Sequence, residues 1–287
     1  MTPENAPDLR DWLGRSETAY DRARVAPALG LAATLDRADL LVRLPTRDAF
    51  LPPTWHWLYF LPTALQSALG RDGHPTRGGF LPPVTLPRRM WAGSRLTFPA
   101  PIAFDARLER QSTIAAIEAK SGRSGALVLV TVRHEIRADG VLAVTDEHDI
   151  VYRDAPKPGA STAPAAPGPE HTAQFRRTVV PDAVLLFRYS ALTFNGHRIH
   201  YDRSYVTEVE GYPGLVVHGP LQATLLLDLV DRHLPDARIA SFTFRARSPL
   251  FDAAPFDVCG ARQGSTVQLW TVAPDGRIAT DAVAELA

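Results

Sequence analysis

Four residues able to do polar chemistry lie within eight positions of the C-terminal half: Asn195, His197, His200 and Asp202. An imidazole changes charge near neutral pH and can accept or release a proton. An amide or a carboxylate beside it can hold a water molecule or orient the ring. These residue types so close together indicate a loop that can hold a water molecule and move a proton.

A second motif, His218-Gly219-Pro220, opens an apolar segment at 221–230. Proline is favoured at the first helical position because its missing N–H would be unpaired there anyway. The amide of Gly219 therefore lies at the positive end of a helix dipole, where an oxyanion is stabilised. A titratable imidazole and an oxyanion site are the minimum needed for chemistry with water next to a carbonyl.

Structural roles compete with catalytic ones at three of these positions. His197 either takes part in catalysis or fixes the loop backbone, and His218 is more typical of a capping or packing residue. Gly219 is either a simple turn residue or a place where a thioester approaches the backbone closely. His200 is the strongest catalytic candidate because of its spacing from Asn195.

The elements predicted after 172 follow the order of a hotdog domain, in which an antiparallel sheet wraps a central helix. We expect a strand-like start at 179–187 and the central helix from Gly219 to about His233. Alternating apolar residues and an Asp275-Gly276 turn then predict four strands, at 238–245, 255–262, 266–273 and 278–285.

The N-terminal half repeats this order, which predicts an α+β double hotdog with two antiparallel sheets, each wrapped around a helix. We expect an extended segment at 35–42, a helix at 55–69 that contains Pro62, and strands at 95–98, 105–116, 125–136 and 141–152. Residues 155–171 hold five prolines and no large apolar side chain, so they predict a linker. The expected division is 1–154 (a degenerate hotdog), 155–171 and 172–287 (the catalytic hotdog).

Composition excludes several classes of protein. The chain has 31 basic and 31 acidic residues and no basic block, so nucleic acid is not an expected partner. Its single cysteine excludes an internal disulfide framework. No apolar run is long enough for a membrane span and the first residues resemble no leader, so we expect a cytoplasmic protein without membrane contact.

The loop at 195–200 resembles the Gly-Asp-x-Asn-Pro-Ile-His signature of the R-specific (MaoC-like) enoyl-CoA hydratases. Asn195 falls on the aspartate of that signature, His197 on its asparagine, Arg198 on its proline and His200 on its catalytic histidine. Together with 211–223, the loop is most similar to a subgroup that includes the mitochondrial 3-hydroxyacyl-thioester dehydratases and the mesaconyl-C4-CoA and itaconyl-CoA hydratases.

The resemblance implies an acyl-CoA hydro-lyase without a metal or other cofactor. Because Asn195 replaces the acid of the signature, proton abstraction is expected to pass to His200, with Asp202 as a candidate orienting partner. Gly219 would polarise the thioester. A monomer and a homodimer of double hotdogs are both compatible with this expectation.

The subgroup also implies a five-carbon dicarboxylyl-CoA substrate, which gives citramalyl-CoA on hydration. Its free carboxylate needs a positive partner, for which Arg198 is the first candidate and Arg188, on the preceding predicted strand, the second. Arg245 and Arg247 are either solvated or a clamp for the CoA phosphates. Two alternatives stay open: a dehydratase of straight-chain 3-hydroxyacyl thioesters, and a non-catalytic acyl-CoA-binding protein.

Overall fold

The computed structural model describes residues 8–46, 48–122, 125–154 and 172–287. Ten strands form one antiparallel sheet in the order β1-β3-β4-β5-β2-β7-β10-β9-β8-β6. The strands are β1 (Ser16–Arg22), β2 (Arg88–Thr97), β3 (Arg107–Gly122), β4 (Gly125–Ala138), β5 (Val141–Arg153), β6 (Phe175–Val179), β7 (Ile239–Ala246), β8 (Phe256–Gln263), β9 (Thr266–Val272) and β10 (Ile278–Leu286).

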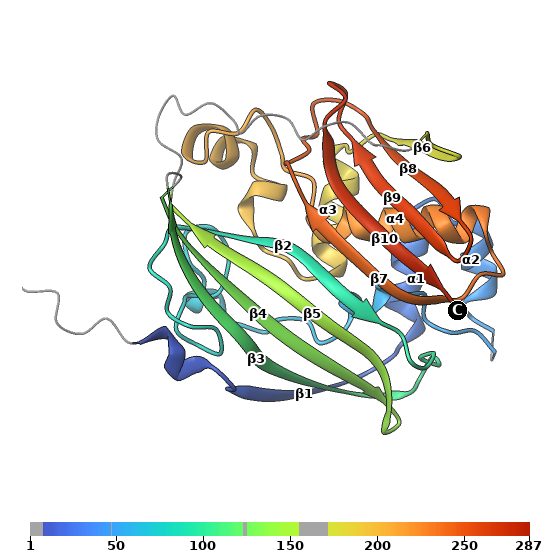
Figure 1. Cartoon of the computed structure of the whole chain (residues 1–287), viewed down its shortest axis with the longest axis horizontal. Coiled ribbons are helices and arrows are strands. Elements are labelled where there is room, and N and C mark those ends of the chain that lie inside the picture. The colour runs from blue at the N-terminus through green and yellow to red at the C-terminus, as the bar shows by residue number, and fades with distance from the viewer. Residues whose placement is uncertain (1–7, 47, 123–124, 155–171) are drawn as a thin grey trace, which may run out of the picture.

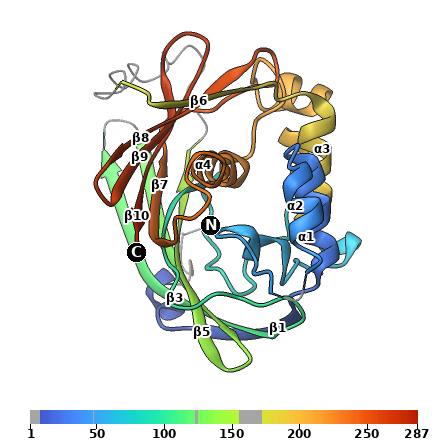
Figure 2. The ribbon, with the colours of Figure 1, turned by 90° about the vertical axis from the view of Figure 1, so that its right-hand side faces the viewer.

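Four helices pack inside or beside this sheet (Figures 1 and 2). They are α1 (Val25–Thr34), α2 (Ala38–Arg43), α3 (Ala183–Leu192) and α4 (Gly219–His233). Short 3₁₀ turns occur at Leu9–Trp12, Trp55–Leu58, Gln66–Ala68 and Arg198–His200, and a π turn at Tyr205–Val209. The double hotdog is confirmed, but the two predicted sheets are joined edge to edge into one.

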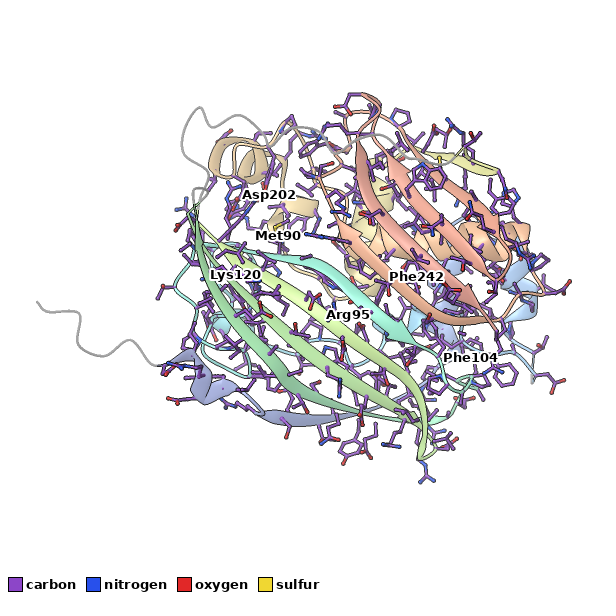
Figure 3. All side chains as sticks on the ribbon, viewed as in Figure 1. Met90, Arg95, Phe104, Lys120, Asp202 and Phe242 are labelled. Carbon is purple, nitrogen blue, oxygen red and sulfur yellow. The ribbon has the colours of Figure 1, made fainter. Side chains whose placement is uncertain are left out.

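The two halves meet where β2 of the first pairs with β7 of the second. Gly93 on β2 lies opposite Arg245 in this pairing, and an added Cβ there would lie 2.2 Å from the carbonyl oxygen of Phe244. Only glycine allows so close an approach of the two backbones. On the outer face of the sheet, Arg95 of β2 pairs with Glu147 and Asp149 of β5 (Figure 3).

Helix α4 is the central helix of the C-terminal half and has the predicted bounds. Its residues 221–230 are all buried, which includes Gln222 and Asp228. Gln222 accepts hydrogen bonds from two threonines of β9 and β10, and Asp228 pairs with Arg37 at 2.6 Å. Each buried polar group on the helix thus has a partner, and the Asp228 pair ties α4 to the N-terminal half.

The helix predicted at 55–69 is absent, and this is the main correction to the N-terminal half. Thr54 and Phe60 adopt left-handed backbone angles, with φ of 70° and 55°. Pro62 then removes the N–H that a continuing helix would need. The segment instead runs as short turns over the inner face of β3–β5.

Two other predictions of local structure are wrong. The extended segment expected at 35–42 contains α2, because Asp36, with φ of 56°, reverses the chain after α1. The strand expected at 179–187 ends at Val179, and α3 follows because Asp182 caps it by accepting from the Leu185 amide. The strands predicted at 238–245, 255–262, 266–273 and 278–285 are confirmed as β7–β10, and the linker predicted at 155–171 lies outside the described residues.

Candidate active site

His200 ends a 3₁₀ turn and is 7% exposed. Its Nδ1 lies 2.7 Å from the carbonyl oxygen of Val216. Because a carbonyl oxygen only accepts, this contact assigns the proton to Nδ1 and leaves the lone pair on Nε2. Among the described residues Nε2 has no hydrogen-bond partner. His200 therefore has the tautomer that a general base requires.

His218 stacks on His200, with ring centres 3.6 Å apart and planes 18° from parallel. Its Nε2 lies 2.8 Å from the hydroxyl oxygen of Ser190, on α3. His218 is fully buried, and its Nδ1 has no partner within the described part of the chain. These contacts agree with a packing role for His218. By stacking on His200, His218 fixes the plane of the His200 ring.

The N-terminus of α4 begins directly after His218 and carries no side-chain cap. A Cβ added to Gly219 would meet no atom within 4 Å. Backbone N–H groups of an uncapped first turn are free to donate. The space in front of Gly219 can therefore admit an oxygen atom that carries developing negative charge.

Asn195 completes the group expected from the sequence. Its Oδ1 accepts from the backbone N–H of His197 at 3.0 Å, so its amide NH₂ is the end left to donate. Together with Ser190 and Pro220, Asn195 lines a cavity of about 970 Å³ that also extends over the N-terminal half. Trp57, Tyr59 and Phe60 line the cavity as well, so the irregular segment that replaces the predicted helix forms part of its wall.

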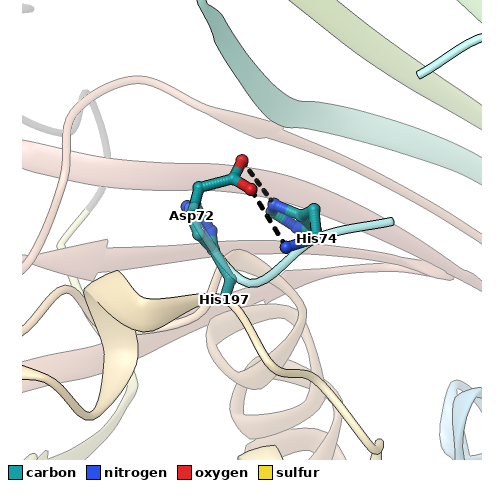
Figure 4. A group of neighbouring side chains, drawn as sticks. All are labelled: Asp72, His74 and His197. Carbon is teal, nitrogen blue, oxygen red and sulfur yellow. Dashed lines mark hydrogen bonds and ion pairs between the residues drawn. The ribbon is translucent and has the colours of Figure 1, made fainter. Parts of the chain in front are cut away.

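The loop that holds Asp72 and His74, which the sequence analysis missed, packs against the catalytic loop at His197 (Figure 4). Asp72 accepts from the backbone N–H of His74 and contacts its Nδ1 at 3.2 Å, and the His74 ring packs 4.1 Å from that of His197. The Arg198 N–H donates to the Asp72 carbonyl. His197 is thus fixed by a distant segment, and no local pattern in the sequence indicates this contact.

Asp72, His74 and His197 also place one candidate metal-ligand atom each within 4.8 Å of one another. Two imidazoles and a carboxylate are a donor set that suits zinc or iron. Here, however, the Asp72 carboxylate already accepts two hydrogen bonds from His74. These contacts make the cluster a support for the loop that carries His197.

Asp202 does not orient His200, which corrects a prediction from the sequence. Its Oδ2 accepts from Arg198 at 2.6 Å, and its Oδ1 accepts from the Tyr205 amide. The partner of His200 is the Val216 carbonyl instead. The i,i+4 spacing of Arg198 and Asp202 was the signal in the sequence that could have predicted their pairing.

The arginines considered for substrate binding fall in three different places. Arg198 lines the cavity but pairs with Asp202 and lies over the Tyr205 ring. Arg188 lies on α3 and not on a strand, and its side chain is exposed. Arg245 and Arg247 are exposed at the outer face, opposite the buried Phe244, and Arg247 pairs with Asp281. None of these three exposed arginines lines the cavity.

The histidines of the site are neutral in the folded protein. Burial and, to a smaller extent, a neighbouring imidazole lower the pKa of His200 to about 3 and that of His197 to about 3. Burial also places the pKa of His218 well below its usual value. Two buried imidazoles that stack on each other cannot both be protonated, because burial and the like charge of the neighbour each disfavour the charged form.

We expect the free energy of unfolding to fall as the pH decreases from 7 to 5. The unfolded chain protonates these imidazoles near pH 6.5 and the folded protein only at much lower pH, so acid favours unfolding. His200 and His218 together should contribute roughly 3 kcal/mol per pH unit below about pH 6. Denaturant titrations at pH 7, 6 and 5 measure this slope. A free energy of unfolding that stays constant over this range would contradict the neutral assignment.

The fold has clear counterparts among solved structures. A MaoC-like dehydratase from Phytophthora capsici superposes with a TM-score of 0.72 at 12% identity, over 98% of each chain. A Mycobacterium tuberculosis protein described as having a double hotdog fold superposes with a TM-score of 0.57 at 15% identity, over 97% of this chain and 98% of its own. These superpositions show that the fold of this molecule is a double hotdog.

Sequence comparison narrows this class. A model of the family described as hydroxyacyl-thioester dehydratase type 2 matches residues 54–252. The chain is also 49% identical, over 97% of its length and 98% of the relative, to the mesaconyl-C(4)-CoA hydratase of Chloroflexus aurantiacus. The chain belongs to the hydroxyacyl-thioester dehydratase type 2 family. In the part of the chain that the structure describes, no helix is both long and apolar enough to cross a membrane.

Proposed function

We propose that this protein hydrates mesaconyl-C4-CoA to citramalyl-CoA; itaconyl-CoA is the other five-carbon substrate that the sequence left open. The observation that carries the proposal is the position of His200 beside the uncapped N-terminus of α4. The relative that is 49% identical, a mesaconyl-C(4)-CoA hydratase, supports this choice of acyl group.

In this proposal the thioester oxygen accepts a hydrogen bond from the Gly219 amide, which draws electrons from the conjugated double bond. The amide N–H of Asn195 donates a hydrogen bond to the attacking water and holds it in place. Nε2 of His200 removes a proton from that water. The new C–O bond forms at the β-carbon as the electrons of the double bond move toward the thioester. The imidazolium then returns its proton to the α-carbon, so atoms and charge balance without an oxidant or reductant.

Several further assignments belong to the same proposal. The acyl-CoA is the only reactant besides water, and no cofactor is required. Residues 1–154 form the degenerate hotdog and 172–287 the catalytic one. We also propose a cytoplasmic location, supported by the bacterial relative, and either a monomer or a homodimer in solution.

The alternative is the reverse reaction, removal of water from straight-chain 3-hydroxyacyl thioesters, as the description of the family suggests. An apolar acyl chain would need an apolar cavity. Most of the lining of the cavity is apolar, but the wall formed by the N-terminal half carries three polar side chains, Arg110, His134 and Asp146. The positive charge of Arg110 favours an acyl group that bears a carboxylate.

Kinetics with three substrates tests the proposed function. The enzyme is incubated with mesaconyl-C4-CoA, crotonyl-CoA and a long straight-chain enoyl-CoA, and the loss of the conjugated thioester absorbance is followed. We expect the highest kcat/KM for mesaconyl-C4-CoA, with citramalyl-CoA identified as the product by mass. A higher kcat/KM for either straight-chain substrate would reject the dicarboxylyl assignment. Binding of CoA esters without turnover of any of them would contradict the hydratase function altogether.

A further inference from the structure

The inner face of the N-terminal half carries a polar cluster inside the cavity: Arg110 on β3, His134 on β4, and Asp146 and His148 on β5. The strand pairing places these residues together, because His134 lies opposite both Ser112 of β3 and Asp146 of β5. Residues two apart on a strand share a face, so Arg110 and Ser112 point to the same side, as do Asp146 and His148. The irregular segment that replaces the helix predicted at 55–69 packs on this face through Trp57 and Phe60, and the cavity reaches all four residues of the cluster.

Three members of the cluster have partners. Asp146 is 2% exposed, and its Oδ2 accepts from the Trp57 indole N–H at 3.0 Å and lies 3.6 Å from Nε2 of His56. Nδ1 of His134 lies 2.8 Å from the Ser112 hydroxyl oxygen. The His148 ring lies 3.8 Å from that of Trp91.

Arg110 differs from the other members. Its guanidinium carbon lies 4.9 Å from the centre of the Phe60 ring, and its Nε is buried without a hydrogen-bond partner. Across the described ranges of the chain, no carboxylate lies within ion-pair distance of it, although Glu17 and Asp21 attract it from farther away. A cation in this position, half-buried and facing a cavity, is a binding site for an anion.

The charges of the groups around Arg110 are consistent with an anion-binding site at this position. Burial lowers the pKa of His134 to about 3 and that of His148 to about 4, so both rings are neutral. Burial alone would raise the pKa of Asp146, but the contact with His56 and the nearby imidazoles hold it below its usual value. Asp146 is therefore an anion already engaged by Trp57, which leaves Arg110 as the cation of this wall without a neighbouring counter-ion.

We propose that Arg110 binds the free carboxylate of the acyl group and thereby selects dicarboxylyl-CoA substrates. This inference rests on the proposed function. In mesaconyl-C4-CoA the carboxylate is attached to the β-carbon, the atom that receives the hydroxyl group. A guanidinium can hold it with two parallel N–H···O bonds, which also fixes the double bond relative to the attacking water. Arg110 takes the role that the sequence analysis gave to Arg198, whose guanidinium is occupied by Asp202.

The test compares Arg110→Gln and Arg110→Lys with a control on the same strand, Arg107→Gln. The Arg107 side chain is 83% exposed, so its substitution should change neither activity nor folding. For each protein, kcat/KM is measured on mesaconyl-C4-CoA and on crotonyl-CoA, which has the same conjugated thioester but no carboxylate. Thermal unfolding of each variant is recorded in parallel.

We expect Arg110→Gln to lower the ratio of the two kcat/KM values by about 10²-fold, the size expected for removing one partner of a desolvated charge pair. Arg110→Lys keeps the charge but not the paired N–H geometry, so its ratio should fall between those of the wild type and Arg110→Gln. If Arg110→Gln does not fold, the ratio measured for Arg110→Lys still tests the proposal.

An unchanged ratio in both Arg110 variants, or equal losses on the two substrates, would overturn the role of Arg110 while leaving the proposed function intact. A wild-type enzyme that turns over crotonyl-CoA but not mesaconyl-C4-CoA would overturn the proposed function and the role of Arg110 together.

Discussion

Replacing His200 with alanine should lower kcat by about 10²–10⁴-fold, the usual contribution of a general acid–base group. The loss follows from the structure because Nδ1 is held by the Val216 carbonyl and only Nε2 can accept the proton of water. The ring is also buried against His218, so the alanine variant should unfold at a lower temperature.

A second variant separates chemistry from stability. His200→Gln has an amide that can still donate to the Val216 carbonyl, but it has no basic nitrogen. We expect it to be as inactive as His200→Ala and closer to the wild type in thermal unfolding. His233→Gln, an exposed substitution, is the control for both measurements. Activity of the glutamine variant within a few-fold of the wild type would show that His200 is not the base.

Gly219→Ala should lower kcat/KM by about 10²-fold, comparable to the loss of one oxyanion-hole donor. The added methyl group meets no protein atom within 4 Å, so the protein can fold around it. It would occupy the space through which the thioester oxygen reaches the Gly219 amide. We expect the loss of activity without a fall in thermal stability, because alanine is a better helix former than glycine.

Gly79→Ala is the matched control, since a Cβ at this loop glycine also meets nothing and its backbone angle is not in the left-handed region. It should have wild-type kcat/KM. If Gly219→Ala also has wild-type kcat/KM, then the N-terminus of α4 does not contact the thioester, and other groups must stabilise the oxyanion.

Helix α4 and strands β7–β10 could be predicted from the sequence because their signals are local. The proline at the start of α4 and the alternating residues of β7–β10 depend on neighbours only a few positions away. The segment at 55–69 has the apolar residues of a helix, but left-handed angles at Thr54 and Phe60 break it. Phe60 is held there by a bond from its amide to the Asp21 carboxylate, which no local pattern reveals.

The sequence signals for the candidate site are local in the same way. Asn195 and His200 lie five positions apart on one loop, and Gly219 belongs to a second motif. In the structure Asn195 lines the cavity, and His200 stacks on His218, the residue before Gly219. Asp72 and His74 come from a loop more than a hundred residues earlier, and Arg110 from a strand of the other half. Their relation to the site depends on the packing of the two halves, which spacing along the chain does not encode.

The most direct test of this account is a crystal structure of His200→Gln with mesaconyl-C4-CoA bound. We expect the thioester oxygen about 3 Å from the Gly219 amide nitrogen, the hydrogen-bond distance of an oxyanion site. The β-carbon should face the residue at position 200 through a single water molecule, and the free carboxylate should face Arg110. A thioester bound away from the N-terminus of α4, with the double bond out of reach of position 200, would contradict the account.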